Sequence, residues 1–222
     1  MKLVSILGDS VSTFQGYNPR GYSVFYDAQM QRANGLSSVS DTWWDMVIKR
    51  MNARLCVNNS YSGSKVTGDS FPAAACEERL QNLGTPAAQP DTILIYAGFN
   101  DFAGGTELIS SLDTYGFEDS YDQVLRTIRQ YYPSAGVLCA TLMRTRVRGD
   151  RSWKFPEYWA GIGLEDYNNV IRWVAQENHC DLADLGRSDV RYETLDGAHP
   201  TAQGHREIAD SWINCMADLG II

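Results

Sequence analysis

Short runs of apolar residues recur along the chain, and segments whose apolar residues have helical spacing lie between them. The runs have the length of buried strands, and their alternation with helical segments is typical of a parallel sheet covered by helices. The predicted strands are Leu3 to Leu7, Leu55 to Asn58, Thr92 to Ala97, Gly136 to Leu142 and Asp181 to Leu185. The predicted helices are Asp41 to Met51, Ala73 to Leu83, Phe117 to Tyr131, Leu164 to Gln176 and Thr201 to Leu219.

Turn and capping residues agree with this division. Asp41 and Thr201 are suitable helix N-caps, and Pro133 ends the helix that precedes it. We expect long loops where polar, glycine and aromatic residues mix, at Phe14 to Ser40, Ala103 to Gly116 and Arg144 to Gly163. The pattern as a whole predicts one doubly wound α/β domain over residues 1–222, with a five-stranded parallel sheet.

Length and charge narrow the class of protein. A chain of 222 residues can bury one substantial core, and no internal repeat, linker or low-complexity segment interrupts it. The 19 basic and 27 acidic side chains give a net charge of −8. Because proteins that bind nucleic acid or anionic membranes gain affinity from positive charge, this balance disfavours both kinds of partner.

The first apolar run and the cysteines bear on the compartment. Met1 to Leu7 leads directly into a polar motif and is too short for a signal sequence or a membrane span, so we expect a cytoplasmic protein. The five cysteines are odd in number and form no CxxC pair, which fits neither a disulfide framework nor a zinc site. We interpret them as buried thiols, and Cys139, inside an apolar run, as a core residue.

Polar residues follow four of the predicted strands. In an open parallel sheet the ligand site lies beyond the carboxyl ends of the strands, so these positions should lie near one another. Each segment alone is an ordinary turn or cap, but together they bring Ser, Gly, Asn, Asp and His to one edge of the sheet. The segments are Gly8 to Ser10, Asn58 to Gly63, Gly98 to Asp101 and Asp196 to Pro200.

These blocks, in this order, resemble the SGNH hydrolases, also called GDSL-like esterases and lipases. The resemblance rests on Gly8-Asp9-Ser10, Gly63, the GxND block at residues 98–101 and the DxxH block at residues 196–199, which together span almost the whole chain. The first block reads GDSVS where many members have GDSL, which leaves the serine in place. The resemblance implies a three-layer α/β/α sandwich of flavodoxin-like type and a serine esterase activity.

A serine hydroxyl is a weak nucleophile at neutral pH and needs a base within hydrogen-bond reach. Ser10 is the expected nucleophile and His199 the expected base. The other two histidines are better explained as structural or solvent-facing residues, because His179 lies at a helix end and His205 lies inside the last predicted helix.

Two carboxylates compete for the role of orienting the base. Asp196 precedes His199 by three residues and can accept a hydrogen bond from its second ring nitrogen. Asp9 is adjacent to the nucleophile. We favour Asp196 because its spacing matches DxxH, and we expect Asp9 to hold the serine loop.

The resemblance also implies an oxyanion hole made of the backbone N–H groups of Ser10 and Gly63 and the side-chain amide of Asn100. No metal is expected, because the histidines lack ligand spacing and form no cluster with acidic residues. The sequence Gly63-Ser64-Lys65 lacks the full spacing of a phosphate loop, so neither a nucleotide nor another cofactor is predicted.

The loops suggest a substrate class. Aromatic residues near the strand ends, including Tyr17 and Trp153, can stack on sugar rings, although anchoring the loops is the more common role for such residues. Arg144 opens an arginine series that could reach an anionic or polyhydroxylated substrate, or could be a solvated loop. No long apolar lid is visible, so we expect hydrolysis of a small acyl ester of a polar alcohol, with carbohydrate O-deacetylation first.

Other functions remain open at this point. Within enzymes, the alternatives are a lipolytic esterase, thioesterase or lysophospholipase acting on longer acyl chains, and a sugar O-acetyltransferase with the same triad. A carbohydrate-binding module that had lost its chemistry would be expected to lack Ser10, Asn100 or His199, and all three are present.

Overall fold

The central sheet has five parallel strands. The computed structural model describes all 222 residues, and its sheet has the order β2-β1-β3-β4-β8. This is the flavodoxin-like order of a doubly wound sheet, and it confirms the predicted fold class. All five predicted strands are present, with bounds that differ by at most two residues at either end: β1 (Leu3–Gly8), β2 (Arg54–Ser60), β3 (Thr92–Tyr96), β4 (Gly136–Ala140) and β8 (Asp181–Ala183).

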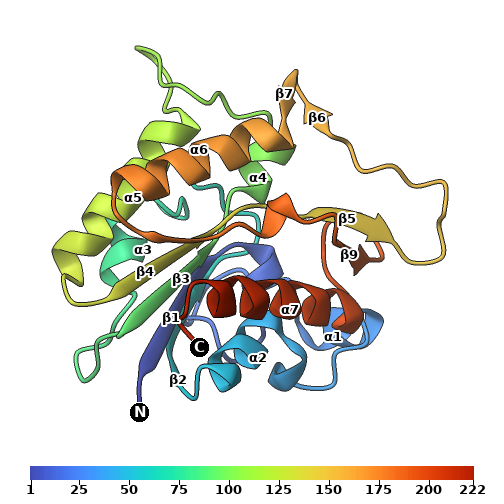
Figure 1. The fold of residues 1–222 in the computed structure, drawn as a ribbon, viewed down its shortest axis with the longest axis horizontal. Helices are drawn as coiled ribbons and strands as arrows, with labels where there is room; N and C mark the ends of the chain where they lie inside the picture. The colour runs from blue at the N-terminus through green and yellow to red at the C-terminus, as the bar shows by residue number, and fades with distance from the viewer.

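Helices cover both faces of this sheet (Figure 1). On one face α2 (Trp43–Arg50) packs against α7 (Ala202–Asp218). On the other face α5 (Phe117–Tyr131) packs against α3 (Glu77–Gln81) and α6 (Leu164–Glu177). None of the helices combines the length and apolar character needed to cross a membrane. The remaining helical segments are short: α1 (Ala28–Ala33), α4 (Phe99–Ala103) and the 3₁₀ turns η1 (Ser10–Ser12), η2 (Val39–Asp41) and η3 (Leu185–Arg187).

The predicted start of α7 is confirmed, whereas the predicted start of α2 is wrong. Thr201 caps α7 by accepting a hydrogen bond from the Gly204 N–H. The cap of α2 is Thr42, because Asp41 belongs to the preceding 3₁₀ turn and its carboxylate accepts the N–H groups of residues 37 and 38. The helix predicted over residues 73–83 is also shorter, since Ala74 and Ala75 donate their N–H groups to carbonyls of residues 65 and 66 instead.

The segment 144–163, predicted as a loop, contains secondary structure. Strand β5 (Arg144–Val147) pairs in parallel with β9 (Arg191–Thr194) in a second, two-stranded sheet. A small hairpin, β6 (Tyr158–Trp159) with β7 (Ile162–Gly163), precedes α6. Strand β9 ends two residues before Asp196, so the second sheet supports the DxxH block from outside the main sheet (Figure 1).

Candidate active site

The carboxyl ends of three neighbouring strands meet at one edge of the main sheet. Gly8, the last residue of β1, is in register with Ser60 at the end of β2 and with Tyr96 at the end of β3. The chain leaves this edge as the Gly-Asp-Ser block, the Gly63 loop and the GxND block. Three segments far apart in sequence are therefore held next to one another by strand pairing.

Ser10 begins the 3₁₀ turn η1 directly after β1. The Asp9 carboxylate caps this turn by accepting the Val11 N–H at 3.0 Å. The Thr13 hydroxyl donates to the Ser10 carbonyl at 2.9 Å, which fixes the other end of the turn. The Ser10 residue is 7% exposed, so its hydroxyl is presented from a rigid, mostly buried turn.

His199 lies between Ser10 and Asp196. Its Nε2 atom is 3.0 Å from Ser10 Oγ, and its Nδ1 atom is 2.7 Å from Asp196 Oδ2. The other carboxylate oxygen of Asp196 accepts the backbone N–H groups of Ala198 and His199. Partial burial raises the pKa of Asp196, but these hydrogen bonds outweigh it and lower the pKa to about 2. Asp196 is therefore ionised at neutral pH and held by three hydrogen bonds.

Asp9 does not contact the imidazole nitrogens and differs from Asp196 in its environment. It is 2% exposed, and burial raises its pKa to about 6, against the opposing effects of the Val11 N–H and of charge at His199. The geometry therefore places Asp196, and not Asp9, on His199. Asp9 holds the serine turn, as expected for the competing carboxylate.

The raised pKa of Asp9 predicts a pH-dependent gain in stability for Asp9→Asn. Because the folded-state pKa of about 6 lies above the ordinary value of 3.8, wild-type stability falls as the pH rises through this window. The amide can still accept the Val11 N–H without carrying a buried charge. Urea unfolding should show a gain of up to about 3 kcal/mol at pH 8, most of it lost at pH 4. Asp113→Asn, at an exposed position, is the control, and an equal gain at both pH values would contradict the assignment.

The three groups expected in an oxyanion hole surround the serine turn. Ser10 is the first residue of η1, so its N–H has no acceptor within the turn. Gly63 has a φ of +82°, a conformation that favours glycine, and its N–H donates to no other group of the protein. Asn100 donates one N–H of its amide to the Ser64 carbonyl at 2.9 Å, which leaves the second N–H free to bind a ligand.

Asp101 connects the GxND block to the Gly63 loop. Its buried carboxylate accepts the N–H groups of Val66 and Thr67 and the Thr67 hydroxyl, at 2.6 to 3.1 Å. Gly98 has a φ of +121° at the start of α4, and a Cβ there would approach the Phe117 ring to 3.0 Å. The GxND block thus fixes the position of Asn100 and of the loop that contains Gly63.

Arg79, which the sequence did not single out, connects the serine turn to the Gly63 loop. Its side chain is fully buried and makes five hydrogen bonds of 2.6 to 3.0 Å, with no carboxylate in ion-pair contact. The acceptors include the Gly8 carbonyl and the Ser64 hydroxyl. Burial lowers the pKa of Arg79 to about 10, so it remains charged at neutral pH. The sequence signal was an arginine on the inner face of a predicted helix.

The residues predicted to bind substrate do not form one cluster in the structure. Arg144 lies on β5 and pairs with Glu157 at 2.9 Å. Tyr17 packs against Phe14 and Trp44, with 44% of the residue exposed. Trp153 lies closer to the histidine loop, since a Cβ on Gly197 would come within 2.7 Å of its indole ring. Of the three, only Trp153 is shown beside the DxxH block, and all three roles stay predictions.

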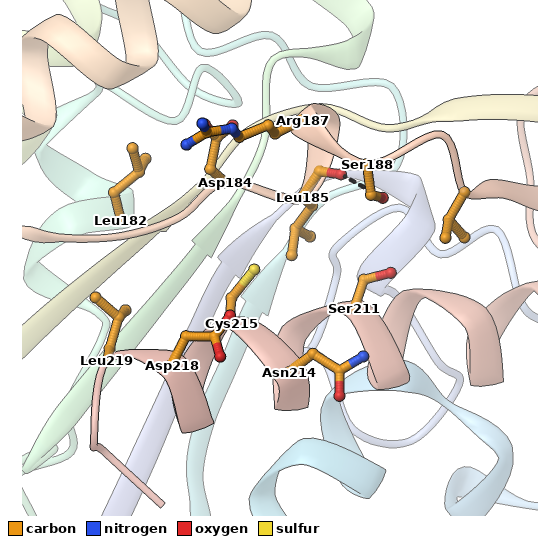
Figure 2. A pocket seen from close by; sticks show the side chains of 11 residues that line it. Leu182, Asp184, Leu185, Arg187, Ser188, Ser211, Asn214, Cys215, Asp218 and Leu219 are labelled. Carbon is orange, nitrogen blue, oxygen red and sulfur yellow. Dashed lines mark hydrogen bonds between the residues drawn. The ribbon is translucent and has the colours of Figure 1, made fainter.

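The other histidines lie outside the site. His205 is buried in α7, its Nδ1 accepts the Trp43 N–H, and burial lowers its pKa to about 3, so it is neutral. His179 lies between α6 and β8 with a φ of +52°. A hollow of about 420 Å³ lies between the β8–η3 segment and α7 (Figure 2). It is separate from the candidate active site, because its lining residues include neither Ser10 nor His199.

Comparison with known proteins gives the family and the fold of the chain. The family model of the GDSL-like lipases and acylhydrolases matches residues 2–150, and a search of curated proteins found no match. A Bacteroides ovatus protein assigned as a GDSL-like lipase is 27% identical, with a TM-score of 0.74 over 98% of this chain and 99% of its own. A similarly assigned Bacteroides uniformis protein is 25% identical, with a TM-score of 0.73 over 98% of this chain and 96% of its own.

A third solved structure shows the same fold at lower identity. It is a carbohydrate acetylesterase family member from Sinorhizobium meliloti, 20% identical, with a TM-score of 0.66 over 99% of this chain and 100% of its own. The match to the family model covers well over half of the chain, and the sheet order is that of the fold. The chain therefore belongs to the GDSL-like lipase and acylhydrolase family and is a carboxylic ester hydrolase.

Proposed function

We propose that Ser10, His199 and Asp196 are the catalytic triad of an esterase that removes short acyl groups, foremost acetyl, from carbohydrate. The observation that carries the triad is the unbroken hydrogen-bond chain from Ser10 Oγ through both ring nitrogens of His199 to Asp196. A base held between a hydroxyl and a carboxylate is the arrangement that activates a serine.

In this mechanism Ser10 Oγ attacks the ester carbonyl while His199 Nε2 takes its proton. The Asp196 carboxylate keeps the Nδ1–H tautomer in place and stabilises the imidazolium that forms. The developing oxyanion is bound by the N–H groups of Ser10 and Gly63 and by the free amide N–H of Asn100. His199 then protonates the leaving alcohol, and water, activated by the same base, hydrolyses the acyl-serine.

One small cavity is lined by the two residues that flank Ser10 in the sequence. Asp9 and Val11, on either side of Ser10, line a cavity of only about 10 Å³ together with aromatic and aliphatic side chains. A cavity of that volume holds about one water-sized group. Because neither Ser10 nor His199 lines this cavity, it does not set the acyl length, and the preference for acetyl rests on the likeness to the carbohydrate acetylesterase family member. The other lining residues are Tyr96, Phe99, Leu142 and Tyr192.

The choice of carbohydrate as the alcohol rests on two observations. Exposed aromatic side chains occur on the hairpin and loops, among them Tyr158 at 71% and Trp159 at 48% exposure, and such rings can stack on sugars. The Sinorhizobium meliloti protein of the same fold is described as a carbohydrate acetylesterase family member. Both support a polar, polyhydroxylated alcohol over a lipid.

The test is a series of nitrophenyl esters from acetyl to dodecanoyl, together with acetate release from acetylated oligosaccharides. We expect kcat/KM to fall more than tenfold between acetyl and octanoyl, because a poor fit of extra methylenes removes transition-state binding. Acetate should be released from the sugars. A preference for long chains without acetate release would replace this proposal with a lipolytic or thioester substrate, and acyl transfer to an added sugar in competition with water would indicate a transferase.

A further inference from the structure

The Phe25 ring is stacked on the imidazole of His199. The ring centroids are 3.4 Å apart and the ring planes differ by only 7°. The hydrogen bonds of His199 to Ser10 and Asp196 use both ring nitrogens, which point outward in the imidazole plane. Phe25 therefore covers a face of the base without competing for either of its hydrogen bonds.

The stack is fixed from both sides of the site. The Phe25 N–H donates to Thr13 Oγ1 at 3.0 Å, and the same hydroxyl donates to the Ser10 carbonyl. The neighbouring Tyr26 donates its hydroxyl to the Pro200 carbonyl at 2.6 Å, directly after His199, and packs edge-on against Phe25 with centroids 4.9 Å apart. This arrangement links the aromatic pair to the serine turn through Thr13 and to the histidine loop through Pro200.

We propose that Phe25 is a positioning residue that stabilises His199 in its protonated form during the reaction. This inference rests on the proposed triad. Before the reaction the imidazole is neutral and gains only stacking, but proton transfer from Ser10 makes it a cation over an aromatic face, which the ring quadrupole attracts. Because this attraction grows as the transition state forms, it raises kcat and leaves substrate affinity nearly unchanged.

The experiment replaces Phe25 by Leu, Trp and pentafluorophenylalanine and measures hydrolysis of nitrophenyl acetate against pH. Leu removes the aromatic face, and the fluorinated ring keeps the shape but reverses the quadrupole. For both we expect kcat to fall about 3- to 30-fold with KM within about twofold. The acidic midpoint of the kcat/KM profile should move to lower pH, while Trp should retain most of the activity. The charged groups facing His199, Asp196 and Asp9, are unchanged in every variant.

Two controls separate the possible results. Trp173→Leu, at a half-exposed position on α6, should leave kcat and the pH midpoint unchanged. If the fluorinated variant matches wild type in kcat and in pH midpoint while Ser10→Ala is inactive, Phe25 is packing only, the inference is wrong and the triad stands. If Ser10→Ala keeps its activity, the proposed function itself is wrong.

Discussion

Replacing Ser10 with alanine is expected to lower kcat/KM for nitrophenyl acetate by a factor of about 10⁴ or more. The Ser10 hydroxyl is the only one within hydrogen-bond distance of the His199 Nε2 atom, so no other group can take over the attack with the same base. The hydroxyl makes no hydrogen bond to any other side chain, and the free energy of unfolding should change by less than about 0.5 kcal/mol. Activity is measured by ester hydrolysis and stability by urea unfolding.

Ser134→Ala provides the matched control, because Ser134 is exposed and follows α5, far along the chain from the site. It should match wild type in both measurements. Activity of Ser10→Ala within tenfold of wild type would mean that another nucleophile performs the reaction.

Replacing Arg79 with methionine is expected to lower the free energy of unfolding by about 4 kcal/mol or more. Methionine fills much of the space but removes all five hydrogen bonds, and the Pro72 and Asn59 carbonyls lose a buried, charged donor. Because Arg79 also anchors the Gly8 carbonyl and the Ser64 hydroxyl, esterase activity should fall together with stability. Urea unfolding followed by tryptophan fluorescence measures the first effect.

Arg126→Met is the control for Arg79, since the Arg126 side chain is 71% exposed and pairs only with Asp122, one helical turn away. It should change stability by less than about 0.5 kcal/mol. If Arg79→Met does not fold, Arg79→Lys retains the charge with fewer donors and should unfold at an intermediate urea concentration. Wild-type stability in either Arg79 variant would contradict the inference that the hydrogen bonds of Arg79 stabilise the fold.

The main sheet could be predicted from sequence because its central strands are buried on both faces. Such strands are continuous apolar runs, as in Ile93 to Tyr96, and they are recognisable without knowledge of their partners. Strands β5 and β9 have no such pattern. Their sequences, Arg-Thr-Arg-Val and Arg-Tyr-Glu-Thr, are stabilised by ion pairs such as Arg146 with Glu193, and these become apparent only once the strands are paired.

The candidate site was predictable where its residues belong to short local blocks. Ser10 lies in a motif of three residues, and Asp196 and His199 lie three residues apart, so the resemblance of these short blocks to the family implied their roles. Arg79 and Phe25 escaped prediction because their partners are distant in sequence: Arg79 reaches a carbonyl 71 residues away, and Phe25 stacks on a ring in the DxxH block. The residues that neighbour Arg79 and Phe25 in the sequence therefore give no indication of those partners.

The order of the blocks divides the proposed chemistry along the chain. The nucleophile and all three oxyanion donors come before residue 101, and the proton-transfer pair comes after residue 195. Between them lies a segment before α5 whose side chains are strongly exposed, with Leu112 fully so. A cut at this point would separate the residues proposed to bind the ester carbonyl from the residues proposed to accept the proton. On this assignment esterase activity requires both parts of the chain. The activity of a chain cut at this point would therefore report that the two parts have reassembled.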